Sequence, residues 1–221
     1  FIGNSSGGLN TITGADNTMV GAGSGYKLTS GSFNIGLGGL TLNSNTTGSD
    51  NVAIGHSALT SNTTGMTNTA VGRASGLANT GGIDNVFIGY TAGYNNTLGY
   101  NNSYIGSGAG VTSATGTNNT ALGFNALYYG TGANNVAIGS QALKNNTTTN
   151  SLTAIGYGAL QSNTTGVGNI AVGGYALTNN SIGTRNTSLG YAVLYANTTG
   201  SSNTGVRSEE HTSELQSHHD L

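Results

Sequence analysis

A five-residue phrase, Asn-Val-Ala-Ile-Gly with small variations, recurs along almost the whole chain at a nearly constant spacing. The phrase is clearest at residues 51–55, 119–123 and 135–139. Its closing glycine recurs eleven times after Gly3, and the 187 residues from Gly3 to Gly190 give a mean period of 17. A fixed period of this kind indicates units that stack on their neighbours. The closing glycines are Gly3, Gly21, Gly36, Gly55, Gly72, Gly89, Gly106, Gly123, Gly139, Gly156, Gly173 and Gly190.

The composition alone is closer to a disordered chain than to an ordinary globular domain. Charged residues make up only 5%, and the chain has 39 glycines, no proline and no cysteine. Disordered segments lack regularly spaced aliphatic residues, whereas here an Ile, Val or Leu precedes each closing glycine. The absence of proline also suits a chain whose backbone N–H groups are used in a continuous sheet. The periodicity therefore predicts an ordered array.

The length of the repeat restricts the fold class. A strand, a crossover helix and a return strand need about 30 residues, so this unit is too short for that arrangement. Helical hairpins are excluded because glycine, asparagine and β-branched residues dominate the repeat. The sequence therefore predicts an all-β fold over residues 1–206, a parallel β-solenoid or β-roll of about twelve coils spaced ~4.8 Å apart.

Within each coil, the residue before the closing glycine is always aliphatic, and we expect it to be buried. Side chains alternate along a strand, so the second and fourth residues of the phrase share one face. The predicted core ladder is Val20, Ile35, Ile54, Val71, Ile88, Ile105, Leu122, Ile138, Ile155, Val172 and Leu189. The predicted turn glycines are Gly55, Gly72, Gly89, Gly106, Gly123, Gly139, Gly156, Gly173 and Gly190.

Two further patterns complete the predicted coil. An Ala-Leu pair, as at 58–59 and 126–127, gives a second inward face, and Asn-Thr-Thr-Gly stretches such as 62–65 form the opposite corner. Each unit is then expected to hold two short strands and two turns. The third residue of the phrase, such as Ala53, would lie on the outer face and form a stripe of small apolar residues. Such a stripe favours association with other chains.

The repeat pattern breaks at Arg207, where a glycine is expected. Residues 207–221 contain four of the seven acidic residues and three of the four histidines. The string Arg-Ser-Glu-Glu-His-Thr-Ser-Glu-Leu-Gln-Ser resembles the translation of a widely used short-read sequencing adapter. We therefore interpret 207–221 as a non-native, disordered tail; a natural polar tail is the alternative. The repeat region then carries four basic and three acidic residues, a balance that argues against nucleic acid binding.

Few residues could carry chemistry. Asp16, Asp50 and Asp84 would align in one column at ~10 Å intervals, a spacing within the range of glycosidase carboxylates. Each also stands directly before the phrase asparagine, where aspartate favours a turn, and we prefer this structural interpretation. His56 has no second ligand in register and is expected on the surface. The sequence therefore predicts no catalytic, cofactor-binding or metal-binding residue, and no enzyme.

Two columns of side chains suggest binding instead. Tyr90, Tyr157 and Tyr191 share one column and Tyr128 and Tyr195 another, so they either form aromatic stripes suited to sugar or protein surfaces or pack over the corners, and we favour packing over the corners. A threonine column would suit an ice-binding solenoid, although it is interrupted near Ala114 and at Ser181. Its members are Thr46, Thr63, Thr80, Thr97, Thr131, Thr147, Thr164 and Thr198.

The phrases at 51–55 and 119–123, each followed by Ala-Leu, resemble the head repeats of trimeric autotransporter adhesins of the YadA-like type. They are also similar to the Asn/Thr/Gly-rich repeats upstream of endosialidase-type chaperone domains in phage tail fibres. The resemblance covers residues 1–206, although the adhesin head repeat is typically shorter than this one. It implies a left-handed β-roll, a homotrimer and an extracellular location on a cell surface or virion.

The sequence thus favours a structural or adhesive segment of an extracellular fibre, acting as a stiff shaft or a multivalent binding head. A host-surface protein or glycan is the expected partner, with no nucleic acid partner and no membrane insertion by this segment. The alternative is an ice-binding solenoid that uses the threonine column.

Overall fold

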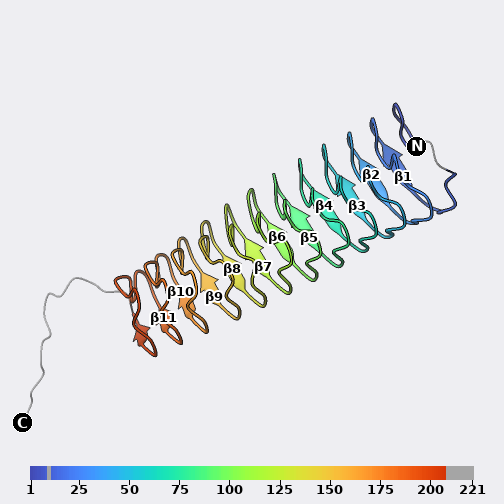
Figure 1. The fold of residues 1–221 in the computed structure, drawn as a ribbon. Coiled ribbons are helices and arrows are strands. Elements are labelled where there is room, and N and C mark those ends of the chain that lie inside the picture. The colour runs from blue at the N-terminus through green and yellow to red at the C-terminus, as the bar shows by residue number, and fades with distance from the viewer. Residues whose placement is uncertain (9–10, 208–221) are drawn as a thin grey trace, which may run out of the picture.

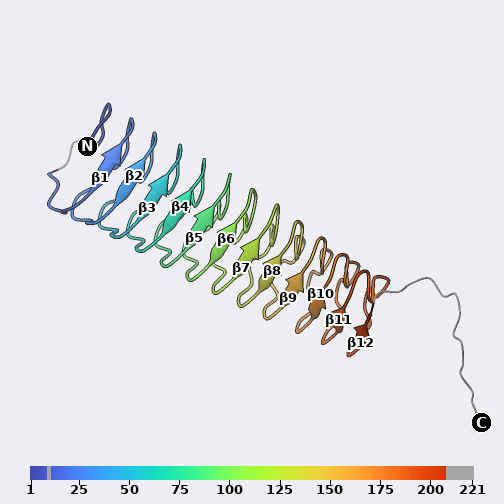
Figure 2. The same ribbon diagram turned by 180° about the vertical axis from the view of Figure 1, so that it is seen from behind.

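The computed structural model describes residues 1–8 and 11–207, which form an elongated rod of stacked coils (Figures 1 and 2). These residues form a parallel β-solenoid of about 11 turns with ~17 residues per coil, as the period predicts, and none of them is helical. Most of the predicted tail, residues 208–221, lies outside the described residues. The strands are β1 Thr18–Val20, β2 Ile35–Leu37, β3 Val52–Ile54, β4 Thr69–Val71, β5 Val86–Ile88, β6 Ser103–Ile105, β7 Thr120–Leu122, β8 Val136–Ile138, β9 Thr153–Ile155, β10 Ile170–Val172, β11 Thr187–Leu189 and β12 Thr204–Val206.

The strands form a single 12-stranded sheet in which each strand pairs in parallel with the next along the chain. Val52 pairs with Thr69, and Thr69 pairs with Val86, so a residue lies beside its equivalent 17 positions later. The coil between β7 and β8 is one residue shorter, because Thr120 pairs with Val136. The array absorbs this deletion in the corner at 130–133 and keeps the strands in register.

The second repeat is out of step with the sequence prediction. Gly36 lies in the middle of β2, where it pairs with Met19 and Ala53, and Ile35 pairs with Thr18 and Val52. Leu37 is therefore the residue before the turn, and Gly38, with a φ of 133°, is the closing glycine. The assignments of Ile35 and Gly36 from sequence were wrong because Ile-Gly occurs two residues before Leu-Gly in this repeat. With Gly38 in its place, the intervals Gly21–Gly38 and Gly38–Gly55 are both 17 residues, and only the first coil, from Gly3 to Gly21, has 18.

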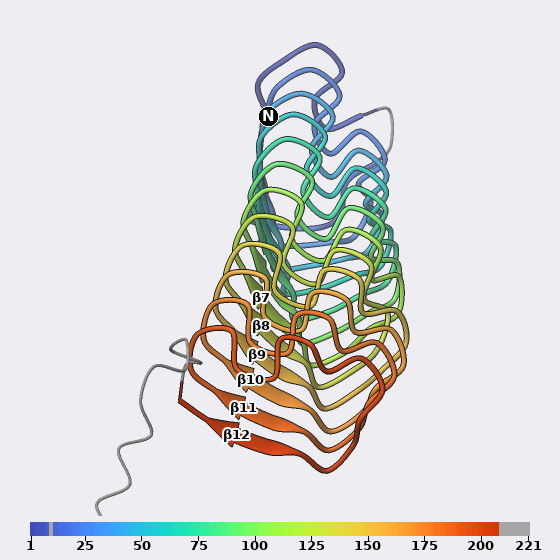
Figure 3. The same cartoon turned by 90° about the vertical axis from the view of Figure 1, so that its left-hand side faces the viewer.

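Each coil holds one strand of three residues, and the Ala-Leu side is built from turns instead of the expected second strand. Figure 3, a view along the rod, shows each coil as a loop with its strand along one side. Left-handed backbone recurs in the Ala-Leu segment, where Ser57 and Leu59 have φ values of 62° and 49°. Such φ values break a strand, so the Ala-Leu segment winds inward as a series of turns.

The inward and outward faces of the strand are the reverse of the prediction. The middle residue of each strand is buried: Ala53, Phe87 and Ala137 are all 0% exposed. The aliphatic residue that follows points outward, and Ile54 is 36% exposed, Leu122 44% and Leu189 48%. The predicted core ladder was therefore wrong. Of its members, Ile35, Ile54, Ile88, Leu122, Ile155 and Leu189 are exposed, and Val20, Val71, Ile105, Ile138 and Val172 are half-buried.

The narrow interior of the coil explains this reversal. The buried partner across the coil is already large, because Leu59, Leu127, Leu143, Leu160 and Leu177 are fully buried. Facing a leucine, the strand has room for only an alanine in most coils. Alternation along a strand defines two faces, but it does not say which one turns inward. Available volume makes that choice, and it places the larger aliphatic residue outside.

Two columns of buried asparagines line the rest of the interior. In one, Asn51 donates from Nδ2 to Asn34 Oδ1 at 3.0 Å, and Asn68 donates to Asn51 Oδ1 at 3.1 Å. Each also donates to a carbonyl of its own corner, as Asn51 does to Gly65 at 2.9 Å. The second column links Asn62 to Asn45 and Asn79 to Asn62 at 3.1 and 2.8 Å. These amides satisfy the buried corner backbone, so the phrase asparagine is structural.

The turn glycines stack directly on one another along the rod. The nine predicted turn glycines have φ between 115° and 137°. A Cβ added at Gly55 would lie 2.8 Å from the carbonyl carbon of Gly72. Both the backbone conformation and the close approach of the next coil require glycine here.

Candidate functional site

The outer face of the 12-stranded sheet carries an uninterrupted column of aliphatic side chains. Two residues of each strand point outward, such as Val52 with Ile54 and Val136 with Ile138, and none of these is fully buried. Threonine or serine replaces the first residue of the pair in several coils, but the second is aliphatic in every strand. We call this surface the sheet face. Large contiguous apolar patches are rare on monomeric soluble proteins and mark interaction sites.

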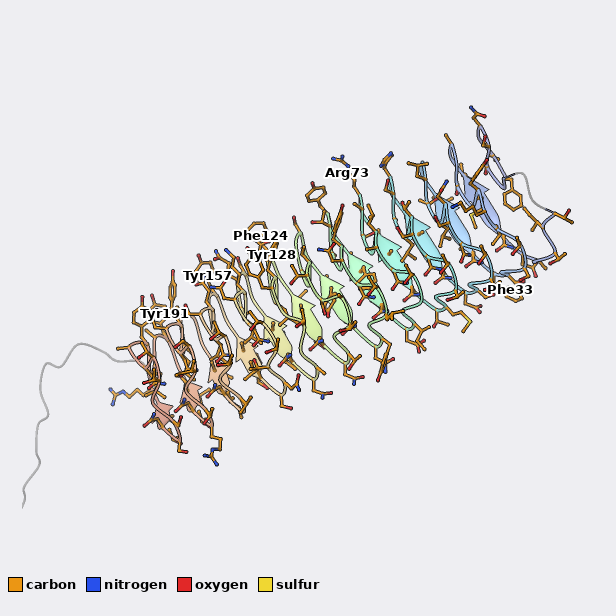
Figure 4. The ribbon with its side chains drawn as sticks, viewed as in Figure 1. Phe33, Arg73, Phe124, Tyr128, Tyr157 and Tyr191 are labelled. Carbon is orange, nitrogen blue, oxygen red and sulfur yellow. The ribbon has the colours of Figure 1, made fainter. Side chains whose placement is uncertain are left out.

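A second surface runs along the rod where the chain leaves the strand. It consists of the two residues after each closing glycine and the two residues after the Ala-Leu segment, as in Tyr90, Thr91, Tyr94 and Asn95. Figure 4 shows Arg73, Phe124, Tyr128, Tyr157 and Tyr191 along this edge, with Phe33 on the opposite side of the rod. We call it the aromatic edge. Of the 11 tyrosines in the chain, all but Tyr100 and Tyr104 lie on it.

Three hollows follow one another along the aromatic edge. The first, of about 220 Å³, is bordered by His56, Arg73 and Tyr90. The second, of about 390 Å³, lies between Tyr90, Phe124, Tyr128 and Lys144. The third, of about 440 Å³, is formed by Tyr175, Tyr191 and Tyr195. Each hollow thus combines aromatic rings with polar groups, and the first two also hold a cation.

The rings of the third hollow pack edge to face and leave large parts of their surface in solvent. Tyr175 lies between Tyr157 and Tyr191, with ring centroids 5.1 and 5.9 Å away. Partial desolvation by these neighbours raises the pKa of Tyr175, and the negative charge of nearby phenolates raises it further. Tyr191 remains 61% exposed. Of the two alternatives drawn from sequence, exposed aromatic stripes describe this edge better than packing over corners.

The three aspartates lie at a different corner of the coil. Asp16, Asp50 and Asp84 all have left-handed φ values of 56–59° and are exposed. Thr67, in the coil between the last two, donates its hydroxyl to Asp84 Oδ1 at 2.5 Å. The aspartates therefore occupy the turn positions expected of them, and the described residues bring no second carboxylate alongside to form an acid and base pair.

His56 is exposed at the aromatic edge, and Ser57 Oγ lies 2.9 Å from its Nδ1. Within residues 1–8 and 11–207, no group of three or more histidine, cysteine or acidic side chains could hold a metal ion. The same part of the chain has no helix that is long and apolar enough to cross a membrane.

The threonine column proposed for ice binding uses its hydroxyls to join successive coils. Thr46 Oγ1 donates to the carbonyl of Thr63 at 3.1 Å, and Thr63 Oγ1 donates to that of Thr80 at 3.0 Å. The pattern continues through Thr97, which donates to Ala114 at 2.9 Å, and Thr164, which donates to Ser181 at 3.1 Å. These hydroxyls therefore point along the rod and satisfy backbone carbonyls.

Sequence reasoning missed the sheet face because it assigned these residues to the core. It also missed that Phe87 and Tyr104 are buried while most other aromatic residues are exposed. One signal was present in the sequence: Phe87 and Tyr104 stand in the strand position that alanine usually fills, and glycines replace leucine in the Ala-Leu segments next to them.

Comparison of the chain with protein-family models, curated proteins and solved structures found no match.

Proposed function

We propose that this chain is a structural and adhesive segment of an extracellular fibre, on a bacterial surface or a phage tail, and that it works as a homotrimer without catalysis. The observation that carries the proposal is the sheet face: one aliphatic residue per coil, often two, along an uninterrupted parallel ladder. The number three comes from the resemblance of the repeat phrase to trimeric adhesin heads.

A second copy of the same chain is the occupant that suits the sheet face best. The face repeats with the period of the coils, so an aliphatic residue such as Ile138 recurs at the end of every strand along its whole length. Copies placed side by side can therefore bury it without loss of register. Its members include Leu122 and Ile170, each 44% exposed in the single chain. Burial of such residues between chains stabilises the assembly at about 25 cal/mol per Å².

The geometry also suits a mechanical role. Every coil is joined to the next by the sheet ladder on one side and by backbone hydrogen bonds at the corners, such as Ser57 N to Gly39 O at 2.9 Å. The asparagine columns add a third line of bonds inside. A rod joined along several lines resists bending, and outward side chains repeated along it allow weak, multivalent contacts.

The test is the mass of the chain in solution, measured by sedimentation and light scattering. We expect the chain to be a trimer, and we expect the double variant Leu122→Asp/Ile138→Asp to be monomeric with an unchanged circular dichroism spectrum. These residues point away from the core, so charge there disrupts association but not folding. Thr165→Asp, at an exposed corner, is the matched control and should keep the mass of the parent. A parent chain that is monomeric at every concentration contradicts the proposal.

The ice-binding alternative receives less support, because the threonine hydroxyls are donated to carbonyls of neighbouring coils. Thermal hysteresis of the full chain measures it directly. A clear positive signal, lost in Thr63→Val, would favour ice binding over the fibre proposal.

A further inference from the structure

The aromatic edge has features that neither the rod nor the sheet face requires. Its rings are not core residues: Tyr90 and Phe124 are 54% exposed and pack mainly against other edge side chains. They also differ from coil to coil, whereas positions that hold the coils together, such as the phrase asparagine, vary little. Solvent-exposed aromatic residues gathered on one edge of a rod indicate a binding surface.

Three of the four cations of residues 1–206 lie on one side of the coil, and the acidic residues lie on the other side with the fourth cation, Arg185. Lys27, Arg73 and Lys144 lie in the columns of the aromatic edge, together with His56. All the acidic residues that the structure describes, Asp16, Asp50 and Asp84, lie at the corner before the strand. In a chain with so few charges, this separation leaves the aromatic edge with cations alone. The edge is therefore complementary to an anionic ligand.

The spacing of the cations limits the kind of anion. Arg73 and Lys144 border neighbouring hollows but are four coils apart, about 19 Å along the rod. Lys27 is three coils before Arg73, a separation of roughly 14 Å. A nucleic acid strand carries a charge at every nucleotide and is held by closely spaced cations, so this edge is too sparsely charged for it. A polymer whose anionic groups are more widely spaced than those of a nucleic acid fits the aromatic edge better.

The rings suit a chain of sugar units. An aromatic face is rich in electron density and packs against the weakly positive C–H face of a pyranose ring, while the phenol hydroxyl and nearby amides bond to sugar hydroxyls. Gln141 lies among these rings and donates to the hydroxyl of Tyr157 at 3.3 Å. Arg73 lies over the ring of Tyr90, 6.0 Å from its centroid, so its guanidinium is positioned beside an aromatic platform.

We propose that the aromatic edge binds a linear acidic polysaccharide, one that bears carboxylate or sulfate groups, laid along the axis of the rod. The rings of the successive hollows stack on sugar units, and Arg73 and Lys144 pair with its anionic groups. The distance from Tyr90 to Tyr191 is six coils, about 29 Å, so one polymer chain can engage all three hollows. This inference deepens the proposed fibre function by naming the class of ligand that an adhesive segment would hold.

The experiment measures binding of the full chain to immobilised hyaluronan and chondroitin sulfate, with dextran as the neutral polymer and an oligothymidylate as the nucleic acid. We expect binding to at least one acidic polysaccharide, and binding to dextran that is at least about tenfold weaker. The double variants Phe124→Ala/Tyr128→Ala and Arg73→Ala/Lys144→Ala should each weaken binding by about tenfold or more. The basic double variant should also reduce the salt dependence of binding.

Matched controls lie on the other side of the rod. Phe33→Ala removes an exposed ring and Arg185→Ala a cation at the corner that also holds the aspartates, and neither should change binding. The inference is overturned if neither acidic polysaccharide binds, if dextran binds equally well, if the controls weaken binding as much as the edge variants do, or if the oligothymidylate binds more tightly. Solution mass is measured for every variant. A trimer that binds no polysaccharide contradicts this inference alone, and a monomer that binds contradicts the fibre proposal alone.

Discussion

The interior of the rod is filled in two different ways in two of its stretches, which we call the leucine stretch (the coils from Leu127 to Leu177) and the aromatic stretch (the coils around β5 and β6). In the coils from Leu127 to Leu177, each strand contributes a small residue, such as Ala154, and each Ala-Leu segment contributes a buried leucine. Around β5 and β6 the arrangement is reversed, because Phe87 and Tyr104 fill the interior from the strand. Glycine then stands in the leucine position at Gly76, Gly93 and Gly110.

The two stretches show that the total volume of the side chains inside a coil is kept nearly constant, whereas the residue types are not. A Cβ at Gly93 would lie 2.3 Å from Phe87 Cδ1, and one at Gly110 would lie 2.4 Å from Tyr104 Cδ2. The two rings also stack on each other, with centroids 5.8 Å apart. A large residue on one wall of a narrow, close-packed interior therefore requires a small residue on the other.

The largest expected effect comes from mixing the two arrangements. Gly93→Leu places a leucine against the Phe87 ring, and we expect a loss of about 3 kcal/mol or more in the free energy of unfolding. The backbone is not the obstacle, because Leu59 in the same column has a φ of 49° against 60° for Gly93. Phe87→Ala/Gly93→Leu recreates the other arrangement and should recover much of the loss. Denaturant unfolding of both variants measures this coupling.

The control for that pair is Gly39→Ala, where an added Cβ would lie 3.5 Å from the His56 side chain. It should change stability by less than about 0.5 kcal/mol. If the double variant is no more stable than Gly93→Leu alone, exchange of volume between the two walls does not explain the difference between the two stretches.

The two stretches also differ in the second asparagine column, which is continuous from Asn146 to Asn197 in and beyond the leucine stretch. Asn163 donates to Asn146 and to Gly166 at 3.3 and 3.0 Å and accepts from Asn180 at 3.1 Å. We expect Asn163→Ala to cost about 3 kcal/mol, because several buried polar groups lose partners. Hydrogen exchange should rise locally in the coils on either side. Asn145→Ala, a half-exposed residue of the preceding coil, should have little effect.

In the aromatic stretch the same column is interrupted by Ser113, which stands in the asparagine position. Tyr104 donates its hydroxyl to Ser113 Oγ at 2.8 Å. Asn96 Oδ1 is left as a buried atom without a hydrogen-bond partner. Ser113→Ala should therefore cost less than Asn163→Ala, on the order of 1 kcal/mol. Equal costs for the two variants would mean that continuity of the column contributes nothing.

Alkaline pH should destabilise the aromatic stretch first. Burial raises the pKa of Tyr104 to about 12, although hydrogen bonds with Ser113 and Asn119 lower it in part. Because the folded pKa lies above the unfolded value near 10, stability is full below pH 10 and falls as pH rises towards 12, by roughly 2–3 kcal/mol. Unfolding measured between pH 9 and 12 tests this, and Tyr104→Phe should have a shallower decline. An identical decline in that variant contradicts the assignment.

The smallest expected effect concerns the other asparagine column, the one that contains Asn51. Leu152 interrupts this column in the leucine stretch. Leu152 N still donates to Asn135 Oδ1 at 3.1 Å, but its buried side chain offers no amide to the next coil. Leu152→Asn would extend the column through new hydrogen bonds and would bury less apolar surface. We expect these effects to offset within about 1 kcal/mol. A loss near 3 kcal/mol would show that the apolar contact matters more than the continuity of the column.

Much of the architecture could be read from the period. Asn51, Asn68 and Asn85 recur at intervals of 17, and the structure places them in one stacked column. The tyrosine columns of the aromatic edge follow from the same register. The period does not show which face of a strand is buried, because side chains alternate in the same way whichever face turns inward. Ala53 is buried and Ile54 is exposed, the reverse of the prediction. The correct alignment of the second repeat could not be predicted for a related reason. Gly36 and Gly38 both fit the local pattern, and only the pairing of the strands shows that Gly38 closes the phrase.

The sequence by itself determined that the chain is a stack of equal coils, since a 17-residue period with glycine and asparagine at fixed places leaves no other compact solution. Only the tertiary structure decided what lies inside the coil. A three-residue strand has two apolar faces in most coils, and the buried leucines of the opposite wall leave room for just the smaller one. Around β5 and β6 the opposite wall carries glycine, and an aromatic ring of the strand fills the interior instead. The larger aliphatic residues are thus directed outward to the surface that we propose joins the chains.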